Sequence, residues 1–153
     1  MKNILYRVYP PEQIFVNSYT FEDKELAINA SCLIPKSIHY TARPIPYVTA
    51  ENYVRCLSQS CYLLAEHVLE NKLIQLDVDV EEFRQAAEDY ELYYRSMAMT
   101  FHSRIEVGEK FVMRFVLKNW REIKRMQDFI LFTFTNHRTV ISGEMSFVFL
   151  PKS

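Results

Sequence analysis

One segment, from Thr49 to Leu69, restricts the folds open to this chain more than any other feature. At helical spacing, most of its circumference is apolar: Tyr53, Leu57, Ser60, Leu64 and Val68 share one face, flanked by Val54, Cys61 and Ala65. The polar stripe is narrow: Glu51, Arg55, Ser58, Tyr62 and Glu66. A helix of this kind needs a partner surface that covers most of it. The sequence therefore predicts one long helix packed against a sheet.

Capping residues mark the start of this helix. Thr49 is a favoured N-cap residue, because its hydroxyl can accept a hydrogen bond from a free backbone amide. Val48 and Tyr53 occupy the positions of a hydrophobic staple, and Glu51 suits the positive end of the helix dipole. We therefore predict that the helix begins at Thr49.

Strand-like segments lie on both sides of the helix. A strand is predicted at 25–34 and a short helix at 80–90, inside an acidic connector that spans 77–96. The remaining chain is rich in aromatic and branched residues and predicts four strands: 97–104, 110–118, 124–135 and 140–150. Turns at Gly108 and at 135–139 predict that these strands are antiparallel neighbours in chain order. This order of elements predicts an α+β hotdog fold, in which a curved antiparallel sheet wraps around one long central helix.

Length and charge limit the kind of protein. A chain of 153 residues, 49% hydrophobic, suits a single domain over 1–153. The net charge of -1 provides no basic surface for a phosphate backbone, so no nucleic-acid partner is expected. No apolar run approaches the roughly 18 residues that cross a bilayer, and the N-terminus has no signal-peptide pattern. A cytoplasmic protein without a membrane partner is expected.

Neither a cofactor nor a metal is expected. Gly108 and Gly143 are the two glycines, too few for a phosphate-binding glycine loop. The three cysteines, Cys32, Cys56 and Cys61, have no CxxC spacing and predict neither a zinc site nor a disulfide framework. Buried free thiols are the expectation.

Three stretches resemble the FcoT-type long-chain acyl-CoA thioesterases, a hotdog family. They are LAINASCLIPKSIHY at 26–40, TAENYVRCLSQSCY at 49–62 and ISGEMSF at 141–147. The resemblance covers most of the chain after about residue 24. It implies a fatty acyl thioester of coenzyme A or acyl carrier protein as substrate, and an acyl tunnel through the core. The family also includes relatives that add glycine to an enoyl thioester.

The resemblance also implies site residues. The family's active-site tyrosine falls on Tyr40, and its asparagine at the helix start falls on Thr49, whose side chain is shorter and has no amide. With Glu51 as a candidate base, these form the expected catalytic set. Expected substrate-binding residues are His39, Arg43, Asn52, Arg55, Gln59 and His102.

Each of these residues also has a structural interpretation. Tyr40 can be a half-buried packing residue, and Glu51 can simply complement the helix dipole. His39 and His102 are isolated histidines that can be exposed or held in the core. Gln59 can face solvent or a neighbouring protomer.

The chemistry of a thioester needs three features. Free amides near 50–52 can hold the carbonyl oxygen, each contributing roughly 3 kcal/mol when well placed. Apolar residues can form a sleeve for the acyl chain: Leu57, Leu64, Phe111, Phe115, Phe132 and Phe134. The third feature, a base or nucleophile, has no clear candidate.

Four functions follow from these residues. Thioester hydrolysis ranks first; conjugate addition of an amine such as glycine to an enoyl thioester ranks second, with Arg43, Arg55, His39 or Arg104 as the carboxylate clamp. His39 and Glu51 are also the residue types of a hydroxyacyl dehydratase. A non-catalytic acyl-carrier-binding module is the fourth. An uncovered sheet edge predicts a homodimer or higher even oligomer.

Overall fold

A computed structural model of the chain describes residues 3–37, 41–123, 129–137 and 141–149, and for 122, 123 and 129–137 it describes the backbone alone. Six strands form the sheet: β1 (Val16–Glu22), β2 (Ala27–Leu33), β3 (Leu92–Phe101), β4 (Lys110–Ile123), β5 (Phe129–His137) and β6 (Ile141–Phe149). The helices are α1 (Leu5–Val8), α2 (Ala50–Glu70) and α3 (Val80–Glu88), with short 3-10 turns at Pro11–Gln13 and Asp23–Glu25.

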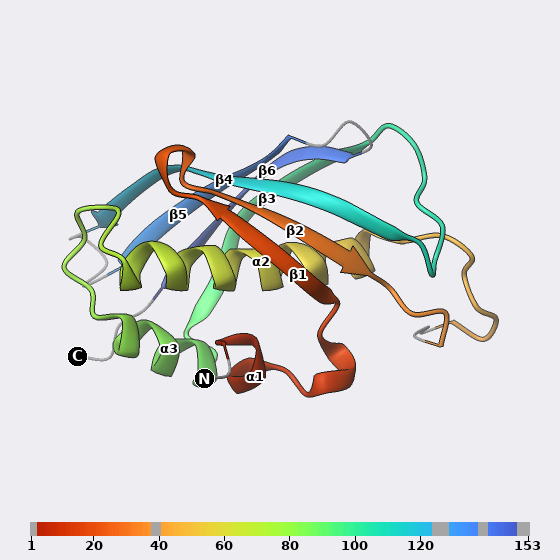
Figure 1. Ribbon diagram of the computed structural model, residues 1–153, viewed down its shortest axis with the longest axis horizontal. Coiled ribbons are helices and arrows are strands. Elements are labelled where there is room, and N and C mark those ends of the chain that lie inside the picture. The colour runs from red at the N-terminus through yellow and green to blue at the C-terminus, as the bar shows by residue number, and fades with distance from the viewer. Residues whose placement is uncertain (1–2, 38–40, 124–128, 138–140, 150–153) are drawn as a thin grey trace.

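The sheet is antiparallel throughout, in the order β1-β2-β4-β5-β6-β3. The long helix α2 runs along one face of this sheet, and α1 and α3 lie on the other side of α2 (Figure 1). The structure therefore has the mixed α+β class that the sequence predicts, with one long helix against an antiparallel sheet.

Helix α2 agrees closely with the sequence prediction. Thr49 is its N-cap, and the Thr49 hydroxyl accepts a hydrogen bond from the Asn52 amide at 3.3 Å. The predicted apolar face is buried, with Tyr53, Leu57 and Leu64 each at most 2% exposed. A helix of 21 residues is roughly 30 Å long, so α2 spans the sheet from end to end.

Glu66, the last member of the predicted polar stripe, does not face solvent. Glu66 is only 8% exposed, and its carboxylate accepts a hydrogen bond from Arg84 Nε at 2.6 Å and another from the Ile4 amide at 3.3 Å. Because Arg84 lies on α3 and Ile4 precedes α1, this carboxylate joins both short helices to α2. The ion pair compensates for the cost of burying the charge.

Two strand predictions need correction. Strand β1 was not predicted, and its Asn17, Ser18 and Thr20 are polar because the strand lies at the edge of the sheet. The strand predicted at 97–104 was expected beside 110–118, whereas β3 begins at Leu92 and pairs with β6 at the opposite edge. The reason is that β2 occupies that side of β4, pairing Leu33 with Lys110 through to Ala27 with Val116.

The second half of the sheet follows the prediction more closely. Strands β4, β5 and β6 are sequential antiparallel neighbours, as expected. The buried thiols are confirmed as well, since Cys32, Cys56 and Cys61 are all free and buried. Within the described ranges, no helix is both long enough and apolar enough to span a membrane.

Candidate functional site at the start of α2

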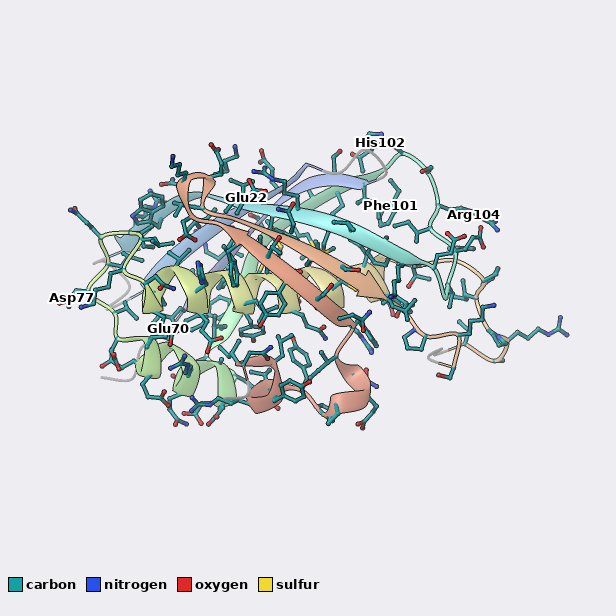
Figure 2. All side chains as sticks on the ribbon, viewed as in Figure 1. Glu22, Glu70, Asp77, Phe101, His102 and Arg104 are labelled. Carbon is teal, nitrogen blue, oxygen red and sulfur yellow. The ribbon has the colours of Figure 1, made fainter. Side chains whose placement is uncertain are left out.

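The start of α2 lies among two loops. The loop before the helix pairs with the loop after β3 through two backbone hydrogen bonds, from the Val48 amide to the Ile105 carbonyl at 2.7 Å and from the Val107 amide to the Pro46 carbonyl at 2.9 Å. Val48, Ile105 and Val107 point inward and are buried. The helix start is thereby fixed to the same end of the molecule as His102 and Arg104 (Figure 2).

Gly108 allows this loop to return to the sheet. Its φ of +86° is a left-handed conformation that favours glycine, and its amide donates to the Ile34 carbonyl at 2.9 Å. A Cβ atom here would lie 2.9 Å from a side-chain carbon of Lys36. The glycine therefore sets how the loop approaches the helix start.

Two backbone amides are available at the helix start. The first turn of a helix leaves amides without partners inside the helix. The backbone amide of Asn52 donates to the Thr49 hydroxyl and is therefore not free. Of the three backbone donors predicted at 50–52, two remain. Within the described residues, the amides of Ala50 and Glu51 have no acceptor.

The side chain of Asn52 adds a polar group at the same place. Asn52 is 5% exposed, on the first turn of α2. In the part of the chain that the structure describes, its carboxamide has no hydrogen-bond partner. The polar atoms of this carboxamide are not among the fully buried, unpaired side-chain atoms of the described chain, so they keep contact with solvent and a ligand can reach them. Asn52 therefore adds a side-chain amide at the helix start, where Thr49 has none.

Most of the charged residues predicted for the site are exposed on its rim. Glu51 and Arg43 are exposed, and Arg55 is exposed while its Nη1 donates to Gln13 Oε1 at 2.8 Å. His102 is exposed and its Nε2 lies 2.8 Å from the Ser142 hydroxyl. Within the described residues, no hydrogen bond or ion pair joins any two of these side chains, so they form no catalytic dyad with one another.

Arg104 also belongs to this rim. It forms an ion pair with Glu106, and its guanidinium lies over the ring of Tyr47, 5.8 Å from the centroid. The hydrogen bond to Glu106 raises the pKa of Arg104, so this residue is a permanent positive charge near the helix start.

Gln59 has a structural role that the sequence analysis did not anticipate. It is fully buried, its Oε1 accepts from the amides of Phe15 and Val16 at 2.8 and 3.2 Å, and its Nε2 donates to the Gln13 carbonyl at 2.6 Å. The side chain ties the N-terminal segment to the middle of α2. It faces neither solvent nor a substrate site.

Two of the predicted residues, His39 and Tyr40, lie outside the described residues. Their assignment remains a prediction from the family resemblance. The predicted acyl sleeve is only partly described: Leu57, Phe111 and Phe115 are packed core residues at 1–2% exposure, as is Leu64 at 0%, and the side chains of Phe132 and Phe134 lie outside the described residues. None of the four described sleeve residues lines either of the two pockets below.

A pocket of about 150 Å³ lies further along α2, and the sequence analysis did not predict it. It forms where α2 faces the segment after α1, the start of β3 and the end of β6. Its polar groups are hydroxyls and one thiol: Tyr9, Ser58, Cys61, Tyr62, Tyr93 and Tyr94. Leu92 and Phe147 complete the lining. Ser58 and Tyr62 could be noticed in the sequence, because they belong to the polar stripe of α2. Tyr9 and Tyr94 could not, because they lie in distant segments that the fold brings to the pocket.

The phenols of Tyr9, Tyr62 and Tyr94 are uncharged at neutral pH. Burial raises the pKa of Tyr62 to about 12, and burial is also the main reason why the pKa values of Tyr9 and Tyr94 are raised. Burial likewise raises the pKa of the Cys61 and Cys56 thiols, so neither is a thiolate nucleophile.

A second pocket, of about 210 Å³, lies near the C-terminal half of α2. Its charged lining consists of the ion pairs that Arg84 forms with Glu66 and Glu70, together with His67, whose Nε2 lies 2.8 Å from Asp23 Oδ1. The ring of His67 also stacks on Phe21. These groups are paired with one another, so this pocket has a structural explanation.

Comparison with known proteins supports the fold. No family model matches the sequence, and no curated protein matches it. Among solved structures, a "putative thioesterase, phenylacetic acid degradation-related protein" from Ralstonia eutropha is similar, with a TM-score of 0.52, 7% identity, and coverage of 86% of this chain and 83% of that one.

Two further structures are similar. An uncharacterized protein from Pyrococcus horikoshii has a TM-score of 0.50 at 12% identity, covering 92% of this chain and 87% of that one. A "putative thioesterase" from Lactococcus lactis has a TM-score of 0.47 at 12% identity, covering 92% and 97%. At identities of 7% and 12%, the likeness to the Ralstonia eutropha and Pyrococcus horikoshii structures shows a shared fold and nothing about function.

Proposed function

We propose that this protein acts on acyl thioesters, and that the start of α2 binds the thioester carbonyl oxygen. The observation that carries the proposal is the group of three donors there: the Ala50 and Glu51 amides, which have no acceptor within the described residues, and the nearly buried carboxamide of Asn52. Donors fixed by the fold stabilise an oxygen that gains negative charge, because they need no reorganisation during the reaction.

Several observations support this reading. The positive end of the helix dipole points in the same direction as the free amides, so it also favours an oxyanion. The Ralstonia eutropha structure, which shares the fold, is described as a putative thioesterase. With the resemblance to FcoT-type enzymes, we infer that the sheet and α2 form a single hotdog domain in which the sheet curves around the helix.

Hydrolysis is the first reaction proposed. Water is the nucleophile, and Glu51 is the carboxylate on the same turn of α2 as the amides. The resemblance adds Tyr40 as a second donor to the substrate. Free acid and the thiol of coenzyme A or acyl carrier protein are the products.

Conjugate addition of glycine to an enoyl thioester is the second candidate, and the cationic rim favours it. Arg43 and Arg55 are exposed near the helix start, and Arg104 is held there by Glu106. A guanidinium binds a carboxylate through parallel hydrogen bonds, as the carboxylate of glycine requires. The three donors would hold the enolate that forms as the amine adds.

We also propose that the protein forms a homodimer or a higher even oligomer. Strand β3 is at one edge of the sheet, and Tyr93, Tyr94 and Phe101 on it are 45%, 42% and 42% exposed. A long edge strand with exposed aromatic residues is a surface on which another chain can pair. A second copy of this chain would place two sites in one assembly.

One experiment separates these functions. The protein is incubated with a medium-chain enoyl thioester of coenzyme A or acyl carrier protein, with and without glycine, and the products are weighed by mass spectrometry. Free acid indicates hydrolysis, a mass gain of one glycine on the tethered chain indicates addition, and a gain of one water on the tethered chain indicates the hydratase direction of a dehydratase. Unchanged substrate in every sample would leave a binding module and contradict the proposal.

A further inference from the structure

The phenol-lined pocket lies on the stripe of α2 that begins at Glu51, one of the two residues whose backbone amides belong to the proposed oxyanion site. Glu51, Arg55, Ser58 and Tyr62 are spaced by three or four residues, so they form one stripe along the helix. At 1.5 Å per residue, Ser58 and Tyr62 lie roughly 10 and 16 Å beyond Glu51. An extended chain advances roughly 1.2 Å per bond, so a chain of about 8 to 14 bonds joins the two places.

Two phenol hydroxyls in the pocket, those of Tyr9 and Tyr62, are hydrogen-bond donors without an acceptor among the described residues. Ser58 has one proton and donates it to the Val54 carbonyl at 2.8 Å. In the hydrogen bond between Ser58 and Tyr94, the phenol of Tyr94 is therefore the donor. No acceptor among the described residues faces either hydroxyl proton. The two rings themselves pack edge to face, with their centroids 6.1 Å apart.

The lining decides what kind of group fits. No residue that lines the pocket is Asp, Glu, Lys, Arg or His, so a charged group would be desolvated there without a counter-charge. The phenols remain protonated well above neutral pH, which keeps them as donors. A volume of about 150 Å³ is comparable to a cavity that accepts a benzene-sized group.

We propose that this pocket binds the far end of the acyl group and selects an uncharged end that carries an oxygen acceptor, such as a ketone or a hydroxyl. Tyr9 and Tyr62 donate to that oxygen, while the aromatic rings and Leu92 cover the adjacent carbons. This inference rests on the proposed thioester function for the position of the carbonyl. It adds the substrate class, a medium-chain acyl group oxygenated near its end.

The test compares two ligands of equal length on the same carrier. The dissociation constants of decanoyl-CoA and 9-oxodecanoyl-CoA are measured by titration calorimetry, so that contributions from coenzyme A cancel. The wild-type protein should bind the oxo ligand at least about tenfold more tightly, because even one hydrogen bond to the oxygen contributes up to roughly 1.4 kcal/mol and two phenols donate to it. The Tyr9→Phe, Tyr62→Phe double variant should bind both ligands equally, with decanoyl-CoA changed by less than twofold.

Tyr90→Phe is the control, since Tyr90 is 77% exposed and does not line the pocket. It should keep the tenfold preference. Equal affinities in the wild type, or a preference that survives in the double variant, would overturn the inference.

A second arm does not depend on thioester chemistry. Free 2-hexanone and pentane are added to protein with isotope-labelled tyrosine rings, and the ring signals are followed by NMR. The ring signals of Tyr9 and Tyr62 are assigned as those that disappear in the Tyr9→Phe and Tyr62→Phe variants. In the wild-type protein, these signals should shift with 2-hexanone and not with pentane. If 2-hexanone shifts them while neither thioester binds, the pocket stands and the thioester function fails; if 2-hexanone leaves them unchanged, the pocket assignment fails.

Discussion

At the scale of single residues, the polar groups on α2 divide into structural and available ones. Gln59 is fully buried and has all of its hydrogen-bonding partners in the N-terminal segment. Asn52 is almost as buried, yet its carboxamide has no partner in the described chain. Sequence alone could not distinguish these two amides, because their partners are far away along the chain. The difference gives Gln59 a role in stability and is the reason why we propose Asn52 for the functional site.

The role of Gln59 predicts a large loss of stability on truncation. Gln59→Ala removes the acceptor of the Phe15 and Val16 amides and the donor to the Gln13 carbonyl. Buried groups left without partners cost about 1 to 3 kcal/mol each, and water that enters the space recovers part of it, so the free energy of unfolding should fall by about 3 kcal/mol. Denaturant unfolding measures this. Gln85→Ala, at an exposed position on α3, is the control, and a loss below about 1 kcal/mol for Gln59→Ala would contradict the role.

The raised pKa values of the pocket phenols predict how stability depends on alkaline pH. The pKa of Tyr62 is about 12 in the folded chain against about 10 in the unfolded chain. Its contribution is therefore fully present below pH 10 and is lost as the pH rises toward 12, because the unfolded chain ionises first. Denaturant unfolding at a series of alkaline pH values measures this loss.

The variant that tests this is Tyr62→Phe, which removes the ionisable group. The free energy of unfolding should fall less steeply between about pH 10 and about pH 12 in Tyr62→Phe than in the wild type. Equal slopes in the two proteins would mean that Tyr62 is not buried as described.

At the scale of elements, local signals predicted the helices better than the strand pairing. Helix α2 was predictable because its cap, Thr49, and its apolar spacing lie within one segment. The position of β3 was not, because the pairing of β2 with β4 forces β3 to the far edge beside β6. Such pairing depends on contacts between residues distant in sequence, which periodicity does not contain. The burial of Glu66 was not predictable for the same reason, since its partner Arg84 is on another helix.

This ion pair between helices gives a prediction at the element scale. Arg84→Ala leaves Glu66, only 8% exposed, without its counter-charge, although the Ile4 amide still donates to it. Loss of one partner of a buried pair costs about 3 to 5 kcal/mol. We expect a loss near 3 kcal/mol by denaturant unfolding, because Glu66 keeps that one hydrogen bond.

Arg95→Ala is the matched control, because Arg95 is exposed on β3 and forms none of the described ion pairs. It should change the free energy of unfolding by less than about 0.5 kcal/mol. Similar losses from the two variants would show that the pair does not hold α3 against α2.

At the scale of the whole molecule, both proposed sites lie along α2, and β3 forms one of the two edges of the described sheet. Glu51 at the helix start and Ser58 and Tyr62 in the phenol-lined pocket share one stripe of α2, which the sequence contains as a periodic pattern. The loops and strands that complete each site, around Ile105 and Tyr94, come from other parts of the chain. The helix half of each site was therefore predictable and the other half was not.

The open edge at β3 predicts the oligomeric state. Light scattering with size-exclusion chromatography, at micromolar concentration, should give at least twice the 18.3 kDa mass of one chain. Tyr93→Lys with Phe101→Lys, on the exposed edge strand, should shift the population toward the single chain. A wild-type mass of a single chain would contradict the assembly.

The central claim, that the start of α2 performs thioester chemistry, is tested most directly by turnover in Asn52→Ala. The rate at which wild-type protein converts a medium-chain acyl or enoyl thioester is compared with that of Asn52→Ala and of Asn71→Ala, at the exposed C-terminal end of α2. Unfolding curves confirm that each variant is folded. Loss of one preorganised donor should slow Asn52→Ala by about a hundredfold while Asn71→Ala is unchanged. A wild-type protein that converts no thioester, or a folded Asn52→Ala variant as fast as wild type, would contradict the account.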